Sequence, residues 1–67
     1  MTVADLKTKL DNARVTIFGG ELPTSLASVA DTYMQLAALR EERGLPVDDY
    51  GECIDFAIQN TLLASSR

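Results

Sequence analysis

The 67-residue sequence predicts an all-α protein of three helices, and three observations support this fold class. Apolar residues recur at spacings of three and four along most of the chain, which is the period of a helix with one buried face. The pattern is interrupted at residues 19–23 and at residues 44–46, where glycine and proline lie close together. Outside residues 14–18, no segment alternates between apolar and polar residues as a half-buried strand does. We therefore expect a single small domain over residues 1–67, with helices at about 3–18, 25–43 and 49–65.

The first helix is expected to begin after Thr2, because a hydroxyl cap followed by Asp5 places an acceptor and an acid at the positive end of a helix. Its apolar side chains follow one another at spacings of three and four: Val3, Leu6, Leu10, Ala13 and Ile17. The segment ends in RVTIF, residues 14–18, whose β-branched residues are also compatible with a short strand. We expect the helix to continue to about Phe18 and to stop at the two glycines that follow.

The second helix is expected at about 25–43, with Thr24 or Ser25 as its N-cap. One face carries Leu26, Val29, Tyr33, Leu36 and Arg40, and it is widened by Met34 and by several alanines. The sequence GLP at 44–46 predicts a Schellman-type ending, with glycine in the left-handed conformation, Leu45 as the hydrophobic residue after it and a proline that blocks continuation.

The third helix is expected at about 49–65 and begins at Asp48 or Asp49, where Asp49 and Glu52 have the spacing of a capping box. Its apolar face consists of Tyr50, Ile54, Ala57, Ile58, Thr61 and Leu62, whereas Phe56 and Leu63 lie on a different side. A linker of about five residues predicts that the second and third helices form an antiparallel hairpin. Because so short a chain builds only a thin core, the surplus apolar surface predicts completion by homodimerisation.

The charge of the chain is unevenly distributed. The net charge is −4, and residues 31–55 hold seven acidic residues against Arg40 and Arg43. Phosphate backbones and anionic membranes are bound by clusters of lysine and arginine, which this chain lacks. A protein with a basic surface is therefore the expected partner, and nucleic acid and membranes are not.

The composition also predicts where the protein resides and excludes several kinds of chemistry. The N-terminus mixes charged and apolar residues, unlike a secretion signal, and no apolar run approaches the ~18 residues of a membrane span. A single cysteine, Cys53, is typical of a reducing compartment, so we expect a cytoplasmic protein with this thiol partly buried. The chain has no histidine, which is the usual base of a nucleophilic triad and the commonest metal ligand. We expect no enzymatic activity, no metal and no cofactor.

Three carboxylates form the one cluster of side chains whose chemistry suits a functional site. Asp48, Glu52 and Asp55 share one face of the third helix, and three acids on one face can hold Mg²⁺ or Ca²⁺. The segment ECID, residues 52–55, resembles one half of the metal motif of all-α NTP pyrophosphatases, whose other half is missing here. Acids also gather at the start of a helix because the helix dipole favours them there. We favour this second interpretation over a metal site.

The function expected from these features is that of a small acidic, non-enzymatic interaction module. It binds and modulates another macromolecule, by inhibition, as small acidic helical proteins of phages and mobile elements often do. The expected partner-binding acidic face consists of Asp48, Asp49, Glu52, Asp55, Glu41 and Glu42. The expected apolar interface consists of Tyr33, Met34, Tyr50, Phe56 and Leu63. Buried aromatic residues usually supply affinity, while charges at the rim steer association.

Two alternative functions remain open. Residues 14–17, Leu22-Pro23, Arg43-Gly44 and the apolar rhythm of residues 50–58 resemble the ribbon–helix–helix DNA-binding family. That resemblance implies a short strand at residues 14–17 and a dimeric DNA-binding transcriptional regulator. The acidic character is instead compatible with a DNA mimic that inhibits a basic nucleic-acid-binding protein.

Overall fold

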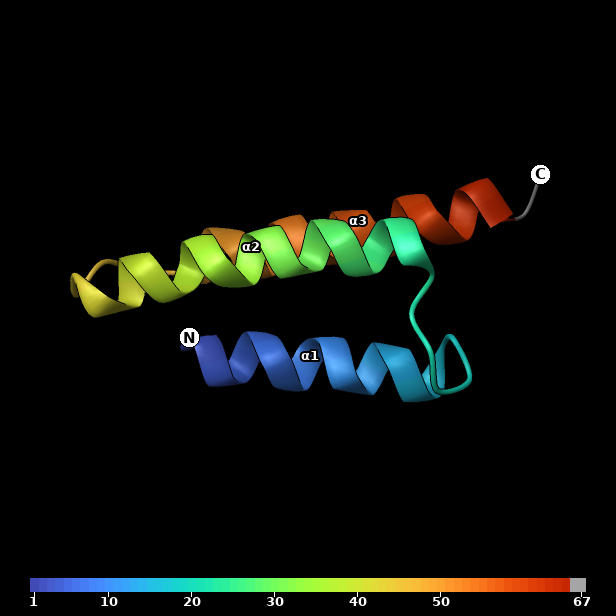
Figure 1. Cartoon of the computed structure of the whole chain (residues 1–67), viewed down its shortest axis with the longest axis horizontal. Coiled ribbons are helices and arrows are strands. Elements are labelled where there is room, and N and C mark those ends of the chain that lie inside the picture. Colours follow the sequence, from blue (N-terminus) through green and yellow to red (C-terminus); the bar gives the residue numbers. More distant parts are fainter. Residues whose placement is uncertain (66–67) are drawn as a thin grey trace.

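The computed structural model describes residues 1–65, which form three helices: α1 (Val3–Thr16), α2 (Thr24–Glu42) and α3 (Asp48–Ser65). No strand occurs in these residues, so the predicted all-helical class is confirmed for them. In Figure 1, α2 runs from right to left, α3 runs from left to right behind it, and α1 lies below the pair. The molecule measures 40 × 18 × 16 Å, so it is elongated along the helices and each helix keeps a large exposed side.

The start of α1 is the predicted one, and a capping box fixes it. The hydroxyl of Thr2 accepts a hydrogen bond from the backbone N–H of Asp5 at 3.3 Å. The Asp5 carboxylate accepts one from the N–H of Thr2 at 2.8 Å. Two backbone donors that a helix start leaves unpaired are therefore satisfied by side chains.

The end of α1 differs from the expectation, because the helix stops at Thr16 rather than near Phe18. The carbonyl of Arg14 accepts the N–H of Gly20 at 2.8 Å, and the Arg14 guanidinium donates to the Gly20 carbonyl at 2.9 Å. This clamp requires the chain to turn at Gly19 and Gly20, whose φ angles are +70° and +116° and suit glycine. Since residues 14–16 are helical, the strand that the ribbon–helix–helix resemblance implies does not form.

The predicted N-cap of α2 is wrong. Pro23 occupies the cap position with a φ of −55°, and no side chain caps this end. Thr24 is already the first helical residue, so neither Thr24 nor Ser25 occupies the N-cap position. The Pro23 carbonyl accepts the first helical bond, from Ala27 N–H at 2.9 Å.

The predicted Schellman ending of α2 is confirmed. The N–H of Leu45 bonds to the carbonyl of Arg40 at 2.9 Å, and the N–H of Gly44 bonds to that of Glu41 at 3.0 Å. Gly44 has a φ of +74°, the left-handed conformation that this motif needs.

Helix α3 begins at Asp48, the earlier of the two predicted starts. The capping box suggested by the spacing of Asp49 and Glu52 does not form, because Asp49 is inside the helix and not at its cap. Val47, just before the helix, is buried, and its carbonyl accepts the N–H of Tyr50 at 3.1 Å.

The core is one thin layer between the three helices. Most predicted face residues take part in it, but Ile17 is 46 % exposed, and the half-buried Phe18 packs against the core beyond the helix end. On α2 the buried line runs through Leu26, Ala30 and Ala37, which leaves Val29 and Leu36 largely exposed. The buried hydrophobic residues are Leu6, Leu10, Ala13, Leu26, Ala30, Ala37, Val47, Ile54 and Ile58.

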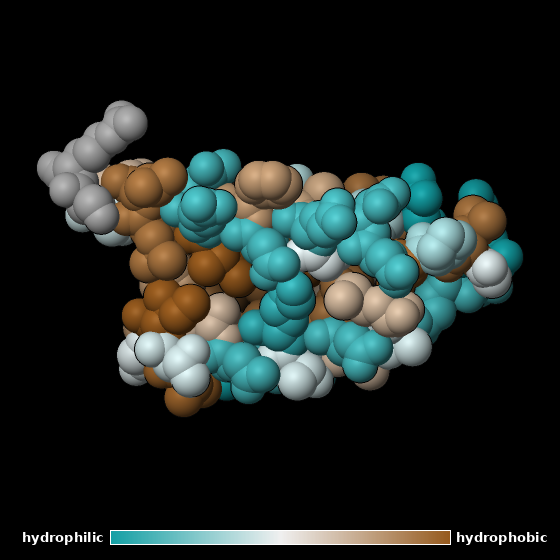
Figure 2. Space-filling view, turned by 180° about the vertical axis from the view of Figure 1, so that it is seen from behind, coloured by the Kyte–Doolittle hydropathy of each residue, from teal (hydrophilic) through white to brown (hydrophobic). Residues whose placement is uncertain are grey.

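The face seen in Figure 2 differs in polarity from one end of the molecule to the other. Figure 2 shows apolar atoms gathered toward the end where α3 finishes, on the left, and polar atoms over most of the opposite end. The polar end contains the last turn of α2, the α2–α3 turn and the start of α3. Five of the ten acidic residues lie there: Glu41, Glu42, Asp48, Asp49 and Glu52.

Candidate functional site: the open face of helices α2 and α3

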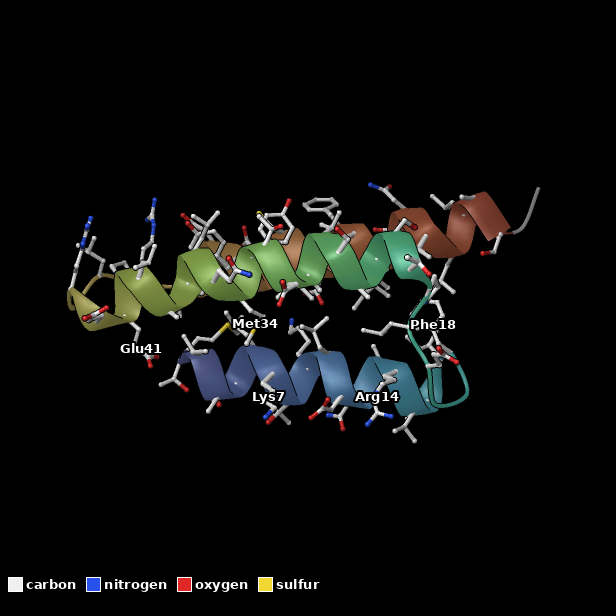
Figure 3. The ribbon with its side chains drawn as sticks, in the orientation of Figure 1. Lys7, Arg14, Phe18, Met34 and Glu41 are labelled. Carbon is white, nitrogen blue, oxygen red and sulfur yellow. The ribbon has the colours of Figure 1, made fainter. Side chains whose placement is uncertain are left out.

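The structure divides the predicted acidic face into two groups, and the first group contacts the N-terminal segment and α1. The Glu41 carboxylate accepts the backbone N–H of Val3 at 2.8 Å, and Figure 3 shows Glu41 projecting from α2 toward α1. The Asp55 carboxylate lies 2.8 Å from the Lys9 ammonium. Asp48 lies 3.4 Å from the N-terminal ammonium of Met1. These three acids, from α2 and α3, therefore bind the N-terminal segment to the helix pair.

The second group of acids is directed to solvent. Glu42, Asp49 and Glu52 are exposed, and their side chains make no hydrogen bond or ion pair within residues 1–65. By helical spacing, Glu42 and Glu52 lie on the outer flanks of their helices, whereas Asp49 shares a face with Cys53 and Phe56. In the same residues, no three carboxylate or thiol groups gather closely enough to hold a metal ion.

The predicted apolar interface is divided as well. Met34 is half-buried and projects toward α1, as Figure 3 shows, so it belongs to the core side of α2. Tyr33 and Tyr50 are half-buried between α2 and α3, with ring centroids 6.1 Å apart and planes tilted by 48°. The Arg40 guanidinium lies 5.4 Å from the centroid of the Tyr50 ring, within the range of a cation–π interaction. Arg40 thus joins the aromatic pair at the α2–α3 seam.

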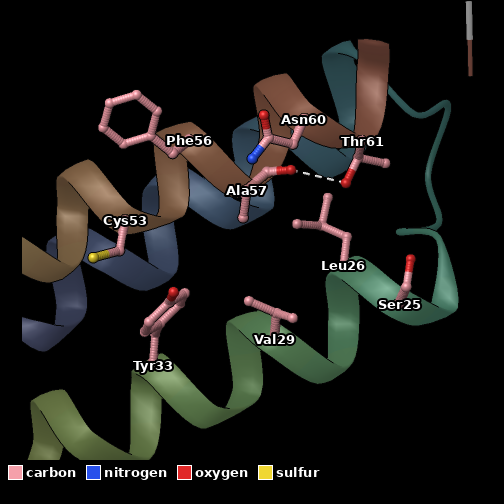
Figure 4. A pocket seen from close by; sticks show the side chains of 9 residues that line it. All are labelled: Ser25, Leu26, Val29, Tyr33, Cys53, Phe56, Ala57, Asn60 and Thr61. Atoms are coloured by element: carbon pink, nitrogen blue, oxygen red, sulfur yellow. Dashed lines mark hydrogen bonds between the residues drawn. The ribbon is translucent and has the colours of Figure 1, made fainter. Parts of the chain in front are cut away.

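A groove of about 450 Å³ lies between α2 and α3, with α1 behind them in the view of Figure 4. Val29 and Tyr33 face Cys53 and Ala57 across it, and Phe56 stands at its edge, 64 % exposed. At one end the Thr61 hydroxyl donates to the Ala57 carbonyl at 2.8 Å and so does not point a free donor into the groove. The lining residues are Ser25, Leu26, Val29, Tyr33, Cys53, Phe56, Ala57, Asn60 and Thr61.

Two residues of the expected apolar interface, Tyr33 and Phe56, line this groove. Cys53 is a partly buried free thiol, as expected. Val29 was assigned to the core face and Asn60 to no site. The sequence signal for this groove is a second stripe on each helix. Cys53, Phe56, Asn60 and Leu63 are spaced by three and four residues along α3, and Val29 and Leu36 are seven residues apart along α2.

Comparisons with protein-family models, with curated proteins and with solved structures gave no match. None of the helices within residues 1–65 combines the length and the apolar character needed to cross a bilayer.

Proposed function

We propose that this protein is a small, cytoplasmic, non-enzymatic interaction module, in which an antiparallel α2–α3 hairpin is completed by homodimerisation. In this proposal the dimer binds and modulates another protein, one with a basic surface. The observation that carries the proposal is the open α2–α3 face, since α1 covers one side of the helix pair and leaves the other as an apolar groove.

The exposed apolar residues of this face support a role in association. Val29, Leu36 and Phe56 expose 42 %, 43 % and 64 % of their surface, and they lie on helices that already contribute to the core from their other sides. Contiguous apolar surface on a small protein usually marks a contact with another molecule. Aromatic residues next to such a groove are the side chains that most often supply binding energy.

The acids that do not hold α1 support the choice of a basic partner. Glu42 and Glu52 lie outside the groove and have no counter-charge within residues 1–65. Solvent-exposed carboxylates of this kind steer a positively charged partner and are available for pairing at the rim of an interface. Glu41, Asp48 and Asp55 are excluded from this role, because their contacts with the N-terminal segment occupy them.

Charge reversal tests the acidic surface. The tagged protein is purified from its native cells as wild type, as Glu42→Lys/Glu52→Lys and as the control Asp11→Lys/Glu21→Lys, which makes the same charge change away from the groove. Quantitative mass spectrometry of the co-purified proteins is expected to show a basic protein with the wild type and the control, and to lose it with the first variant. Equal recovery of every co-purified protein with all three forms would contradict the proposal, provided that their circular dichroism spectra agree.

A further inference from the structure

The open face carries two parallel stripes that match in length. On α2, Val29 and Leu36 are seven residues apart, and Arg43, the C-cap residue, follows after another seven. On α3, Asp49, Phe56 and Leu63 are also seven residues apart. Residues seven apart lie on the same face of a helix. The two helices have 19 and 18 residues, so the two stripes are similar in length.

The size of this face suits a second helix pair. The whole molecule measures 40 Å along its long axis and 16 Å along its short axis, and α2 and α3 are each ~27–28 Å long at ~1.5 Å per residue. Two helices of another molecule, packed as in a four-helix bundle, cover a face of this shape along its full length.

The charges of this face are complementary to those of the same face on a second molecule. Arg40 and Arg43 lie where α2 ends, and Asp49 lies where α3 begins, at the same end of the helix pair. If a two-fold axis runs along the groove, α2 of each copy faces α3 of the other at the same height, and the arginine end meets the aspartate. If the axis instead crosses the helices, α2 faces α2 in reverse, and the arginine end meets the uncharged start of α2.

We propose that a second copy of this chain occupies the groove, related to the first by a two-fold axis parallel to the helices. The α2–α3 pairs of the two copies form a four-helix bundle, with α1 on the outside of each. Arg40 of each copy pairs with Asp49 of the second copy, at the same end of the bundle. This arrangement rests on the homodimer of the proposed function and specifies its geometry.

A charge-swap experiment on the full chain tests the arrangement. Sedimentation equilibrium is measured at low ionic strength for the wild type, Arg40→Glu, Asp49→Lys and an equimolar mixture of the two variants. Each variant alone places like charges together at both symmetry-related contacts, so its self-association is expected to weaken roughly tenfold or more. In the mixture, the carboxylate introduced at position 40 of one copy faces the ammonium introduced at position 49 of the other, and the second contact is unchanged. Association is therefore expected to return to near the wild-type value.

Two controls accompany the experiment. Asp11→Lys makes the same charge change on α1 and is expected to associate as the wild type does. Arg43→Glu is a second arginine variant, and the Arg43 side chain has no hydrogen bond or ion pair within residues 1–65 to lose. It replaces Arg40→Glu if the loss of the Tyr50 contact lowers the helicity measured by circular dichroism.

The possible results separate the geometry from the homodimer itself. Variants that weaken association and recover on mixing support the axis along the groove. A wild-type dimer that neither variant weakens, or that mixing does not restore, overturns the axis but leaves the homodimer standing. A wild type that stays monomeric across the micromolar range overturns both, and the groove is then left to a different protein; the Glu42 and Glu52 experiment still tests that partner.

Discussion

At the scale of single residues, short polar contacts fix the start of α1. The capping box of Thr2 and Asp5 satisfies two backbone donors with side chains that are adjacent in sequence. Both bonds are exposed to solvent, so each contributes modestly, yet a chain of this size has only ~3–5 kcal/mol of stability from its core. A single cap is therefore a measurable share of the total.

We expect Thr2→Ala to lower the free energy of unfolding by about 1 kcal/mol, because alanine cannot accept the Asp5 N–H. Urea denaturation followed by circular dichroism measures the change. Thr8→Ala is the matched control, since the Thr8 hydroxyl only donates to the Ala4 carbonyl within the helix and alanine favours the helix. Equal destabilisation by both variants would show that the cap has no special effect.

Gly51 is a buried helical glycine whose missing side chain leaves space for Met1. A Cβ at this position would lie 2.8 Å from the Met1 sulfur and 3.6 Å from a methyl group of Leu6. The Met1 side chain is flexible and 55 % of the residue is exposed, so it is able to move aside. The glycine therefore costs helix stability without a rigid neighbour that requires it.

We expect Gly51→Ala to raise the free energy of unfolding by about 0.5 kcal/mol, because the gain in helix propensity of up to ~1 kcal/mol exceeds the cost of moving Met1. Gly51→Val is expected to destabilise, because its extra methyl groups reach toward the fully buried Leu6. Thermal unfolding of the two variants tests this order. If Gly51→Ala lowers the melting temperature, the Met1 contact contributes more than the helix gains.

At the scale of elements, α1 is attached by apolar burial, with polar contacts around it. Leu6 is completely buried, whereas the Lys9–Asp55 pair lies at the surface, with the lysine side chain half-buried and the aspartate side chain exposed. Surface ion pairs contribute ~0.2–1 kcal/mol and are weakened by salt. Removing a buried leucine side chain costs ~2–5 kcal/mol. The leucine, rather than the ion pair, should decide whether α1 stays in place.

We expect Leu6→Ala to destabilise the protein by ~2–5 kcal/mol, enough to unfold most molecules at room temperature. Val15→Ala lies on the same helix, is 58 % exposed in the wild type and should change stability by under ~0.5 kcal/mol. Urea denaturation of both variants provides the comparison. A loss of under ~1 kcal/mol for Leu6→Ala would mean that α1 contributes little to the cooperative unit.

At the scale of the whole molecule, the uneven distribution of apolar surface is the main feature. Helix α1 covers one side of the α2–α3 pair, and Phe56 and Leu63 remain more than half exposed on the rest of it. Because a thin core supplies little stability, a dimer that covers these residues should be more stable than the monomer.

We expect the melting temperature of the wild type to rise with protein concentration, because association stabilises the folded state by mass action. Phe56→Glu should abolish this dependence while the far-ultraviolet circular dichroism stays unchanged, since Phe56 is mostly exposed in the single chain. Val15→Glu, a similarly exposed position on α1, should keep it. A wild-type melting temperature that does not vary with concentration would contradict the homodimer.

Local signals in the sequence were sufficient wherever one segment decides its own structure. Thr2 with Asp5 predicts the start of α1, and the GLP sequence at 44–46 predicts the end of α2, because each stop or start depends on bonds between neighbouring residues. The N-cap of α2 was missed for a local reason too: Pro23 sets the entry into the helix and displaces the hydroxyl caps after it.

The partners of the carboxylates, in contrast, were decided by the tertiary structure alone. Periodicity placed Asp48, Glu52 and Asp55 on one face of a helix, and the sequence offers no reason to treat them differently. Only the position of α1 provides Asp48 and Asp55 with cationic partners, the N-terminus and Lys9, and leaves Glu52 in solvent. A contact between residues 46 positions apart depends on how helices pack, which helical spacing within one segment does not specify.

By itself, then, the sequence determined the three helices, most of their ends and the apolar sides of α1 and α3, because hydrogen bonds and periodicity within a segment fix these features. The tertiary structure decided which acids hold α1, and it brought Val29 and Tyr33 together with Cys53 and Phe56 in one groove. The physical reason is that a helix with two apolar stripes can bury only one of them against its own chain. Which stripe stays open depends on where α1 packs.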